Sequence, residues 1–299
     1  MNYQEFINKM EEMIKSKLSE GEKVEATTVS KNNNTILHGL LFKNLNSNLC
    51  TVIYLELFYE LYLEGISFEC IADQLWEELQ ENHPKGNLDM SFFCDFEKVK
   101  EHIIYRLINY EMNKDRLRDT PHIRFFDLAI VFYYVLSTPE LAEGIIMIQN
   151  HYLDMWNITA SKLADIAKRN TPKLLPPMFC EIKDVLEPLP PYINFDFENA
   201  TRFYVLCNEK KLHGAAVILY PEVLPSIAKK LQQDLYIIPS SIHECLIFGK
   251  QDAKDYTAEF LHNITKKINR SEIPADEILS DYPFFYDYKA NTLTQLTSF

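Results

Sequence analysis

The sequence predicts an α+β protein in which helices pack against mixed or antiparallel sheets, with two halves that a duplication could relate. Three observations predict this class. Apolar residues recur at both helical and strand spacing, and the elements do not follow the strict βαβ alternation of a doubly wound fold. Of the 299 residues, 47% are hydrophobic and 24% charged, which is ordinary globular composition.

The N-terminal part predicts helices around one hairpin. Phe6, Met10, Ile14 and Leu18 recur at helical spacing and predict a helix over residues 3–19. Strand-like alternation on both sides of an Asn-rich turn then predicts a β-hairpin. The apolar spacing of the following segments predicts three more helices, at residues 54–65, 68–82 and 95–114.

The middle of the chain predicts strands, a helix and a connector. The continuous apolar run at 125–137 is typical of a strand covered on both faces. A short strand at 144–149 leads into a helix that Asn157 or Thr159 caps and Asn170 ends. Six prolines between residues 172 and 191 mark a boundary. We therefore expect an N-terminal α+β region (1–171), a Pro-rich connector (172–198) and a C-terminal α+β region (199–299).

In the C-terminal region, turn and cap residues separate the predicted strands and helices more clearly. We expect strands, helices and a closing hairpin in the order strand 201–208, strand 214–220, helix 221–233, strand 234–241, strand 244–249, helix 252–268 and a hairpin turning at 289–291. The tripeptide LHG occurs at 37–39 and again at 212–214, each time after a polar turn. A duplication of the two halves would explain this repetition, and the favoured alternative is chance or common turn chemistry.

Charge and cysteine content exclude several classes of function. A net charge of −13 repels phosphate backbones, so no direct nucleic-acid binding is expected. The six cysteines form no CxxC pair and no Cys/His array with zinc spacing, and they predict reduced core residues rather than a metal site. The N-terminus lacks an apolar leader segment and no run is long enough to span a bilayer, so we expect a cytoplasmic protein.

The glycines exclude the common phosphate-binding loops. Seven glycines are spread along the chain, and no two of them lie within fifteen residues of each other. A dinucleotide fingerprint needs three glycines in six residues, and a Walker loop and a GxSxG nucleophile elbow each need two close together. No cofactor is therefore expected.

One short stretch combines residues that occur in hydrolases. Ser240 to Glu244 reads SSIHE, and His213 lies in a neighbouring turn of the predicted sheet. A hydrolase site needs a serine hydroxyl within hydrogen-bond reach of an imidazole, so Ser241, His243 and His213 are the candidate catalytic residues. The alternative interpretation is a structural turn in which the serines bond the backbone. Adjacent strand residues face opposite sides, so Glu244 is not expected to orient His243.

A metal-dependent nuclease is a further alternative. Asp196, Glu209 and Lys211 have the spacing of sites in which carboxylates bind Mg²⁺ and a lysine polarises the attacking water. However, Glu209 and Lys211 fall in the predicted turn after a strand rather than within the strand. This placement favours a solvated turn.

The leading functional hypothesis is a non-catalytic protein that binds another macromolecule, most simply a protein. Its motivation is the lack of a phosphate loop, metal cluster or nucleophile elbow in a strongly acidic, aromatic-rich chain. Aromatic residues dominate binding hot spots, and the runs 132–134 and 284–288 are the aromatic candidates. One form of this hypothesis is an acidic decoy, of mobile-element or defence type, that occupies a DNA-binding protein.

Several segments together resemble a known family. They are MNYQEF, IIMIQNHYLDMW followed by KLADIAKRNTPKLLP, and NEKKLHGAAVILYPEVLPSIAKKLQQDLYIIPSSIHE with the later EILSDYPFFYDY. They resemble a bacterial domain-of-unknown-function family common in gut anaerobes, and the resemblance runs through nearly the whole chain. More distantly, the middle and C-terminal segments look like a second bacterial family of unknown function. The resemblance implies an α+β scaffold and a cytoplasmic setting, and it brings no activity, cofactor or catalytic residue.

Overall fold

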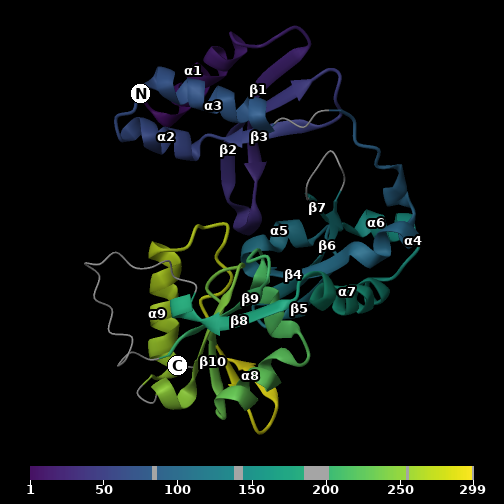
Figure 1. Ribbon diagram of the computed structural model, residues 1–299, viewed down its shortest axis with the longest axis vertical. Helices are drawn as coiled ribbons and strands as arrows, with labels where there is room; N and C mark the ends of the chain where they lie inside the picture. Colours follow the sequence, from purple (N-terminus) through teal and green to yellow (C-terminus); the bar gives the residue numbers. More distant parts are fainter. Residues whose placement is uncertain (83–85, 138–143, 185–201, 254–255, 298–299) are drawn as a thin grey trace. The chain divides into compact units, whose positions relative to one another are not determined.

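The computed structural model describes residues 1–82, 86–137, 144–184, 202–253 and 256–297. It divides into two compact units (Figure 1). Unit 1 holds Met1–Phe93 and a short segment that begins at Leu136, and unit 2 holds Cys94–Val135 and Ile145–Phe299. Each unit is described by itself below.

Unit 1 is a three-stranded antiparallel sheet covered on one face by helices. The strands lie in the order β1-β2-β3, and β1 pairs with β2 so that Val24 faces Phe42 and Ala26 faces Leu40. This confirms the predicted hairpin and adds β3, which the sequence did not predict. The elements of unit 1 are α1 (Tyr3–Lys15), β1 (Glu22–Ser30), β2 (Ile36–Asn44), β3 (Cys50–Tyr54), α2 (Glu56–Leu63) and α3 (Phe68–Asn82).

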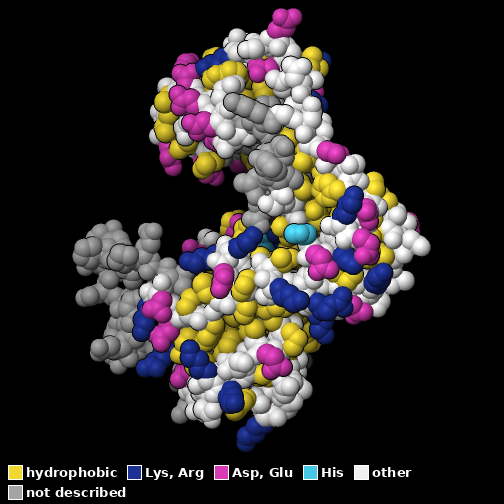
Figure 2. Space-filling view, turned by 45° about the vertical axis from the view of Figure 1, so that its right-hand side comes forward, with side chains coloured by type: hydrophobic (Ala, Val, Ile, Leu, Met, Phe, Trp, Pro, Cys, Tyr) yellow, Lys and Arg dark blue, Asp and Glu magenta, His cyan; other side chains and the backbone are white. Residues whose placement is uncertain are grey.

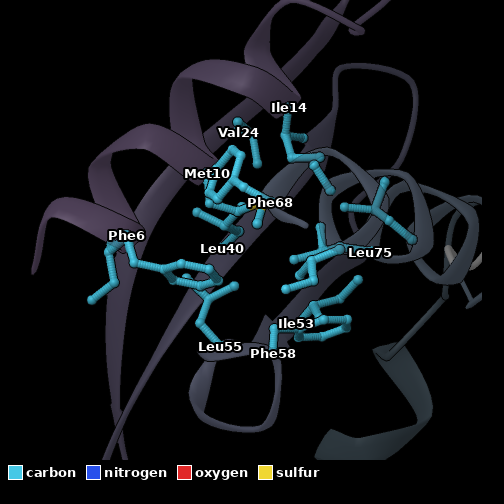
Figure 3. Close-up of a cluster of buried hydrophobic side chains, with 14 of the residues drawn as sticks. Phe6, Met10, Ile14, Val24, Leu40, Ile53, Leu55, Phe58, Phe68 and Leu75 are labelled. Atoms are coloured by element: carbon cyan, nitrogen blue, oxygen red, sulfur yellow. The ribbon is translucent and has the colours of Figure 1, made fainter. Parts of the chain in front are cut away.

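Helix α1 starts at a capping box. The Asn2 side chain accepts from the Glu5 backbone N–H, and the Glu5 carboxylate accepts from the Asn2 N–H, each at 2.9 Å. The periodic apolar residues of the helix then point into one core. Figure 3 shows Phe6, Met10 and Ile14 directed towards side chains from the sheet and from α3. The periodicity of the sequence therefore identified this core.

Unit 2 contains two sheets. A four-stranded sheet has the order β4-β6-β5 with β7 beside β6, and a six-stranded antiparallel sheet has the order β13-β12-β10-β11-β9-β8. The strands are β4 (Ile103–Asn109), β5 (His122–Phe125), β6 (Leu128–Leu136), β7 (Gly144–Met147), β8 (Pro177–Glu181), β9 (Tyr204–Asn208), β10 (Leu235–Ile238), β11 (Cys245–Gly249), β12 (Phe284–Asp287) and β13 (Thr292–Gln295). The helices are α4 (Phe96–Val99), α5 (Lys114–Leu117), α6 (Asn150–Trp156), α7 (Ala160–Leu174), α8 (Val223–Leu231) and α9 (Ala258–Ser271).

Two sequence predictions in unit 2 are wrong. The helix predicted over 95–114 is α4, one 3₁₀ turn and then β4, in which all seven residues are buried. An apolar run buried on both faces satisfies helical spacing as well as strand spacing, so periodicity did not separate them. The strand predicted at 214–220 is a 3₁₀ helix, Gly214–Leu219.

Helix α7 also extends beyond its predicted end. Thr159 caps it as predicted, accepting from the Lys162 N–H at 3.2 Å, whereas Asn157 is the left-handed C-cap of α6. Asn170 does not end the helix. Its buried side chain donates to the Lys100 and Ile103 carbonyls at 2.8 and 3.2 Å, and the helix continues through Pro172. These hydrogen bonds hold α7 against the start of β4.

The α+β class is confirmed, since antiparallel sheets carry helices in both units. The compact units differ from the regions expected from the proline run. β8 lies within that run and pairs with β9 in one sheet, so the expected connector contributes a strand to unit 2, and residues 185–198 of the connector lie outside the described ranges. The LHG segments have different local structure, because the first lies in β2 and the second enters a 3₁₀ helix.

Candidate functional site

The SSIHE stretch forms a paired turn at the end of β10. Residues 239–242 run beside residues 277–280, held by bonds from Ile242 N to the Glu277 carbonyl (2.8 Å) and from Leu279 N to the Ser240 carbonyl (3.0 Å). The pairing links two segments that lie far apart in the chain. It thereby places Glu277, which the sequence analysis did not single out, beside the stretch.

His213 and His243 lie next to each other. Their ring centroids are 5.0 Å apart, and the His213 backbone N–H donates to Nδ1 of His243 at 3.2 Å. Because Nδ1 accepts this bond, the neutral His243 ring carries its proton on Nε2. That nitrogen lies 3.5 Å from the Glu277 carboxylate. His243 is therefore oriented on one side by a backbone donor and on the other by a carboxylate.

The close approach at His213 explains the glycine that follows it. Gly214 donates its N–H to the His243 carbonyl at 2.8 Å. A Cβ at Gly214 would lie 2.6 Å from the Asn208 nitrogen and 2.7 Å from the His243 oxygen. A side chain at this position would push the two histidine segments apart, so the glycine sets their spacing.

Ser241 is bonded to groups other than an imidazole. Its hydroxyl oxygen accepts from the His243 backbone N–H at 2.9 Å, and its O–H donates to the Glu244 carboxylate. The side chain is 2% exposed. Burial raises the pKa of Glu244, while the neighbouring His243 and the Ser241 hydrogen bond oppose that rise. The structure brings the three candidate catalytic residues together, but it joins Ser241 to Glu244 and His243 to Glu277.

His213 is held in its neutral form. Burial lowers its pKa to about 3, with smaller contributions from the positive Arg106 and from His243. Arg106 reaches this region from β4, where it is 6% exposed and lies over the Tyr133 ring at 4.7 Å. A neutral imidazole can accept or donate a hydrogen bond, so His213 is suited to a structural contact or to a base.

Two of the three residues proposed for the nuclease, Glu209 and Lys211, lie in a turn and not in a strand. Asp196 lies outside the described residues. Lys211 follows β9 in a turn with a left-handed backbone (φ 53°) that also contains Glu209, as the sequence predicted. Within the described ranges, no three His, Cys, Asp or Glu side chains gather as metal ligands would.

The aromatic runs are largely buried. Phe132 and Tyr134 of β6 and Phe284 and Tyr286 of β12 are each less than a tenth exposed. Tyr133, Phe285 and Tyr288 of the same runs are partly exposed. Aromatic residues in β-strands fill the core because their large apolar area is best removed from water.

A different surface stands out in unit 1. Leu57 and Leu63 of α2 are each 65% exposed, and Ile66 just after the helix is 38% exposed. The exposed Glu60 and Glu64 lie between and beside them. Figure 2 shows acidic and hydrophobic side chains next to one another on this unit. We call Leu57, Glu60, Leu63, Glu64 and Ile66 the α2 surface.

The negative charge of the chain is concentrated in this part. Residues 1–93 hold 15 acidic and 7 basic residues, in a chain whose net charge is −13. The sequence alone shows that acidic residues are concentrated in this part of the chain. It does not predict that Leu57 and Leu63 are exposed, because apolar residues in a short helix are normally interpreted as core.

None of the helices in the described ranges combines the length and the apolar character needed to cross a membrane. No curated protein and no solved structure matches the chain. One family model does, and it covers residues 3–288. The chain therefore belongs to the DUF5688 family, a family of unknown function.

Proposed function

We propose that the protein acts without catalysis, by binding the basic and apolar surface of another protein through the α2 surface. The observation that carries this proposal is the pair of leucines, Leu57 and Leu63, each 65% exposed among carboxylates in the acidic part of the chain. Large exposed apolar groups next to charges mark interaction sites on protein surfaces.

The helix presents this surface rigidly. Phe58 is 4% exposed and anchors α2 in the core of unit 1. Tyr59 and Tyr62 stack at 6.1 Å, and the N-terminal amine donates to the Tyr62 hydroxyl at 3.1 Å. A surface that is already ordered loses little conformational entropy when it binds.

Burial of the two leucines would supply part of the binding free energy of a complex. Complete burial of one leucine side chain contributes about 1.5–3 kcal/mol, so two leucines supply the apolar centre of a small interface. Glu60 and Glu64, which lie between and beside the leucines, favour a basic partner and raise the association rate. An acidic decoy that occupies a DNA-binding protein is one form of this function.

The proposal is tested by affinity capture from bacterial lysate with the wild type and the double variant Leu57→Ser/Leu63→Ser. The control is Leu45→Ser, which changes a leucine of unit 1 that is 74% exposed but lies in a turn outside the α2 surface. We expect a protein that the wild type and the control retain at physiological salt, that the double variant releases, and that is lost at high salt. Equal retention by all three proteins, or retention that salt does not change, contradicts the proposal.

The cellular setting is part of the proposal. All six cysteines are free. Cys207 and Cys245 are buried, whereas Cys50, Cys70 and Cys94 are exposed, so the prediction of core cysteines is wrong for these three. Free thiols persist in a reducing compartment, which supports a cytoplasmic protein.

A hydrolase that uses Ser241, His243 and His213 is the second candidate. The two adjacent imidazoles and the Glu277 carboxylate beside His243 favour it. The buried hydroxyl of Ser241 and its bond to Glu244 oppose it, because a nucleophile must reach both substrate and base.

A further inference from the structure

Unit 2 contains a pocket with an excess of positive charge. The pocket has a volume of about 240 Å³ and lies between α7 and the segment 96–101. Helix α7 contributes Lys162, Arg169 and Lys173, and the facing segment contributes Lys100. Two carboxylates, Glu97 and Glu101, also line it.

The basic residues of α7 share one face of the helix by their spacing. Lys162, Ile166, Arg169 and Lys173 follow one another at intervals of four, three and four, which places them in one row along an α-helix. The row is held over the pocket by Asn170, whose side chain donates to the Lys100 and Ile103 carbonyls. The positions of the cations are therefore set by a rigid helix.

Within the described ranges, two of these cations take part in neither an ion pair nor a cation–π contact. Lys100 is paired with Glu97 at 2.5 Å, and the Lys162 ammonium lies over the Phe96 ring at 5.0 Å. No ion pair within the described ranges involves Arg169 or Lys173. These two residues are spaced by four on the same helix, where like charges repel. An anion between them removes that repulsion.

We propose that this pocket binds the phosphoryl group of a small molecule. A guanidinium offers two parallel donors to phosphate oxygens, and a lysine adds a point charge, so Arg169 and Lys173 together match a phosphoryl group. The volume of about 240 Å³ is smaller than the pockets of drug-sized ligands, which are about 300–1,000 Å³, so the pocket is suited to a small ligand. Figure 2 shows Lys and Arg side chains on one face of unit 2 with carboxylates among them.

The test is calorimetric titration of the whole protein with inorganic pyrophosphate at constant ionic strength. The variants are Arg169→Gln and Lys173→Gln. The matched control is Lys168→Gln, which removes an exposed charge from the same helix but from outside the pocket. We expect saturable binding by the wild type, at least tenfold weaker binding by each pocket variant and a change of less than twofold in the control.

Three results overturn the proposal. The first is the lack of saturable pyrophosphate binding by the wild type. The second is an equal loss of affinity in Lys168→Gln, which would mean that overall charge and not the pocket is responsible. The third is displacement of pyrophosphate by a single-stranded oligonucleotide that binds more tightly as its length increases. Arg169 and Lys173 would then belong to a nucleic-acid-binding surface. The α2 double variant should bind pyrophosphate normally, so this proposal and the protein-binding proposal fail independently.

Discussion

Nε2 of His243 lies 3.5 Å from Oε1 of Glu277, while Nδ1 of the same ring accepts from the His213 backbone N–H at 3.2 Å. The ring is thus fixed from two directions by segments that are distant in the sequence. Because a neutral imidazole has one donor and one acceptor nitrogen, this arrangement assigns the proton to Nε2.

The first prediction concerns this tautomer. Imidazole ¹⁵N chemical shifts at pH 7.5 should identify His243 as protonated on Nε2 and unprotonated on Nδ1. Glu277→Gln should leave that tautomer in place, because the amide oxygen can still accept from Nε2–H. A His243 ring protonated on Nδ1 would show that the His213 backbone contact does not exist in solution.

The second prediction concerns acid stability. The folded protein holds His213 at a pKa of about 3, against an ordinary value of 6.5, chiefly through burial. Between these values the unfolded chain binds a proton that the folded protein does not, so the free energy of unfolding falls as the pH is lowered from 6.5 towards 3. The limit is about 1.4 kcal/mol per pH unit.

His213→Asn removes this titration and keeps a residue that tolerates the left-handed backbone found at His213 (φ 52°). Urea unfolding at pH 7.5 and pH 5 should show a loss of stability in the wild type that exceeds the loss in the variant by up to about 2 kcal/mol. The control variant His151→Asn replaces an exposed histidine, and it should lose as much stability between pH 7.5 and pH 5 as the wild type. Equal losses in all three proteins would mean that His213 titrates normally.

The third prediction separates a structural serine from a catalytic one. Ser241→Ala removes the acceptor for the His243 N–H and the donor to Glu244, which costs about 2 kcal/mol for buried groups. The melting temperature should fall by about 4–8 °C, and a serine-directed fluorophosphonate should not label the wild type at Ser241. A variant with unchanged melting temperature, together with labelling of Ser241, would support the hydrolase instead.

The fourth prediction concerns the spacing of the histidine segments. Gly214→Ala puts a Cβ within 2.9 Å of three neighbouring atoms, and such overpacking costs about 1–3 kcal/mol. Gly144→Ala is the control, because its added Cβ would meet Leu136 at an ordinary 3.6 Å. Denaturant midpoints should fall for the first variant and change little for the second. The opposite order would contradict the packing described at Gly214.

The sequence predicted well where one face of an element is solvated. Phe6, Met10 and Ile14 keep a helical period in α1, and the alternation around the Asn-rich turn identified β1 and β2. It failed at one fully buried strand, although the buried strands β6 and β9 were predicted. In β4 every residue is buried, so Ile103 and Leu107 matched a helical spacing by coincidence.

The sequence predicted the local part of the candidate site and missed the part that depends on long-range contacts. Ser241 and His243 are two residues apart, and their proximity follows from the chain itself. Glu277 reaches His243 through the pairing of residues 239–242 with 277–280, a long-range contact that no local pattern signals. The burial that lowers the pKa of His213 likewise arises from tertiary packing.

The central claim is that the α2 surface binds a protein. The most direct measurement places a photo-crosslinking amino acid at position 57 of the full chain, in living cells that contain the protein naturally, with position 45 as the control. We predict a discrete crosslinked partner at position 57 that is absent at position 45 and is competed by excess wild type. Crosslinking that is equal at both positions, or absent from both, would contradict the proposed function.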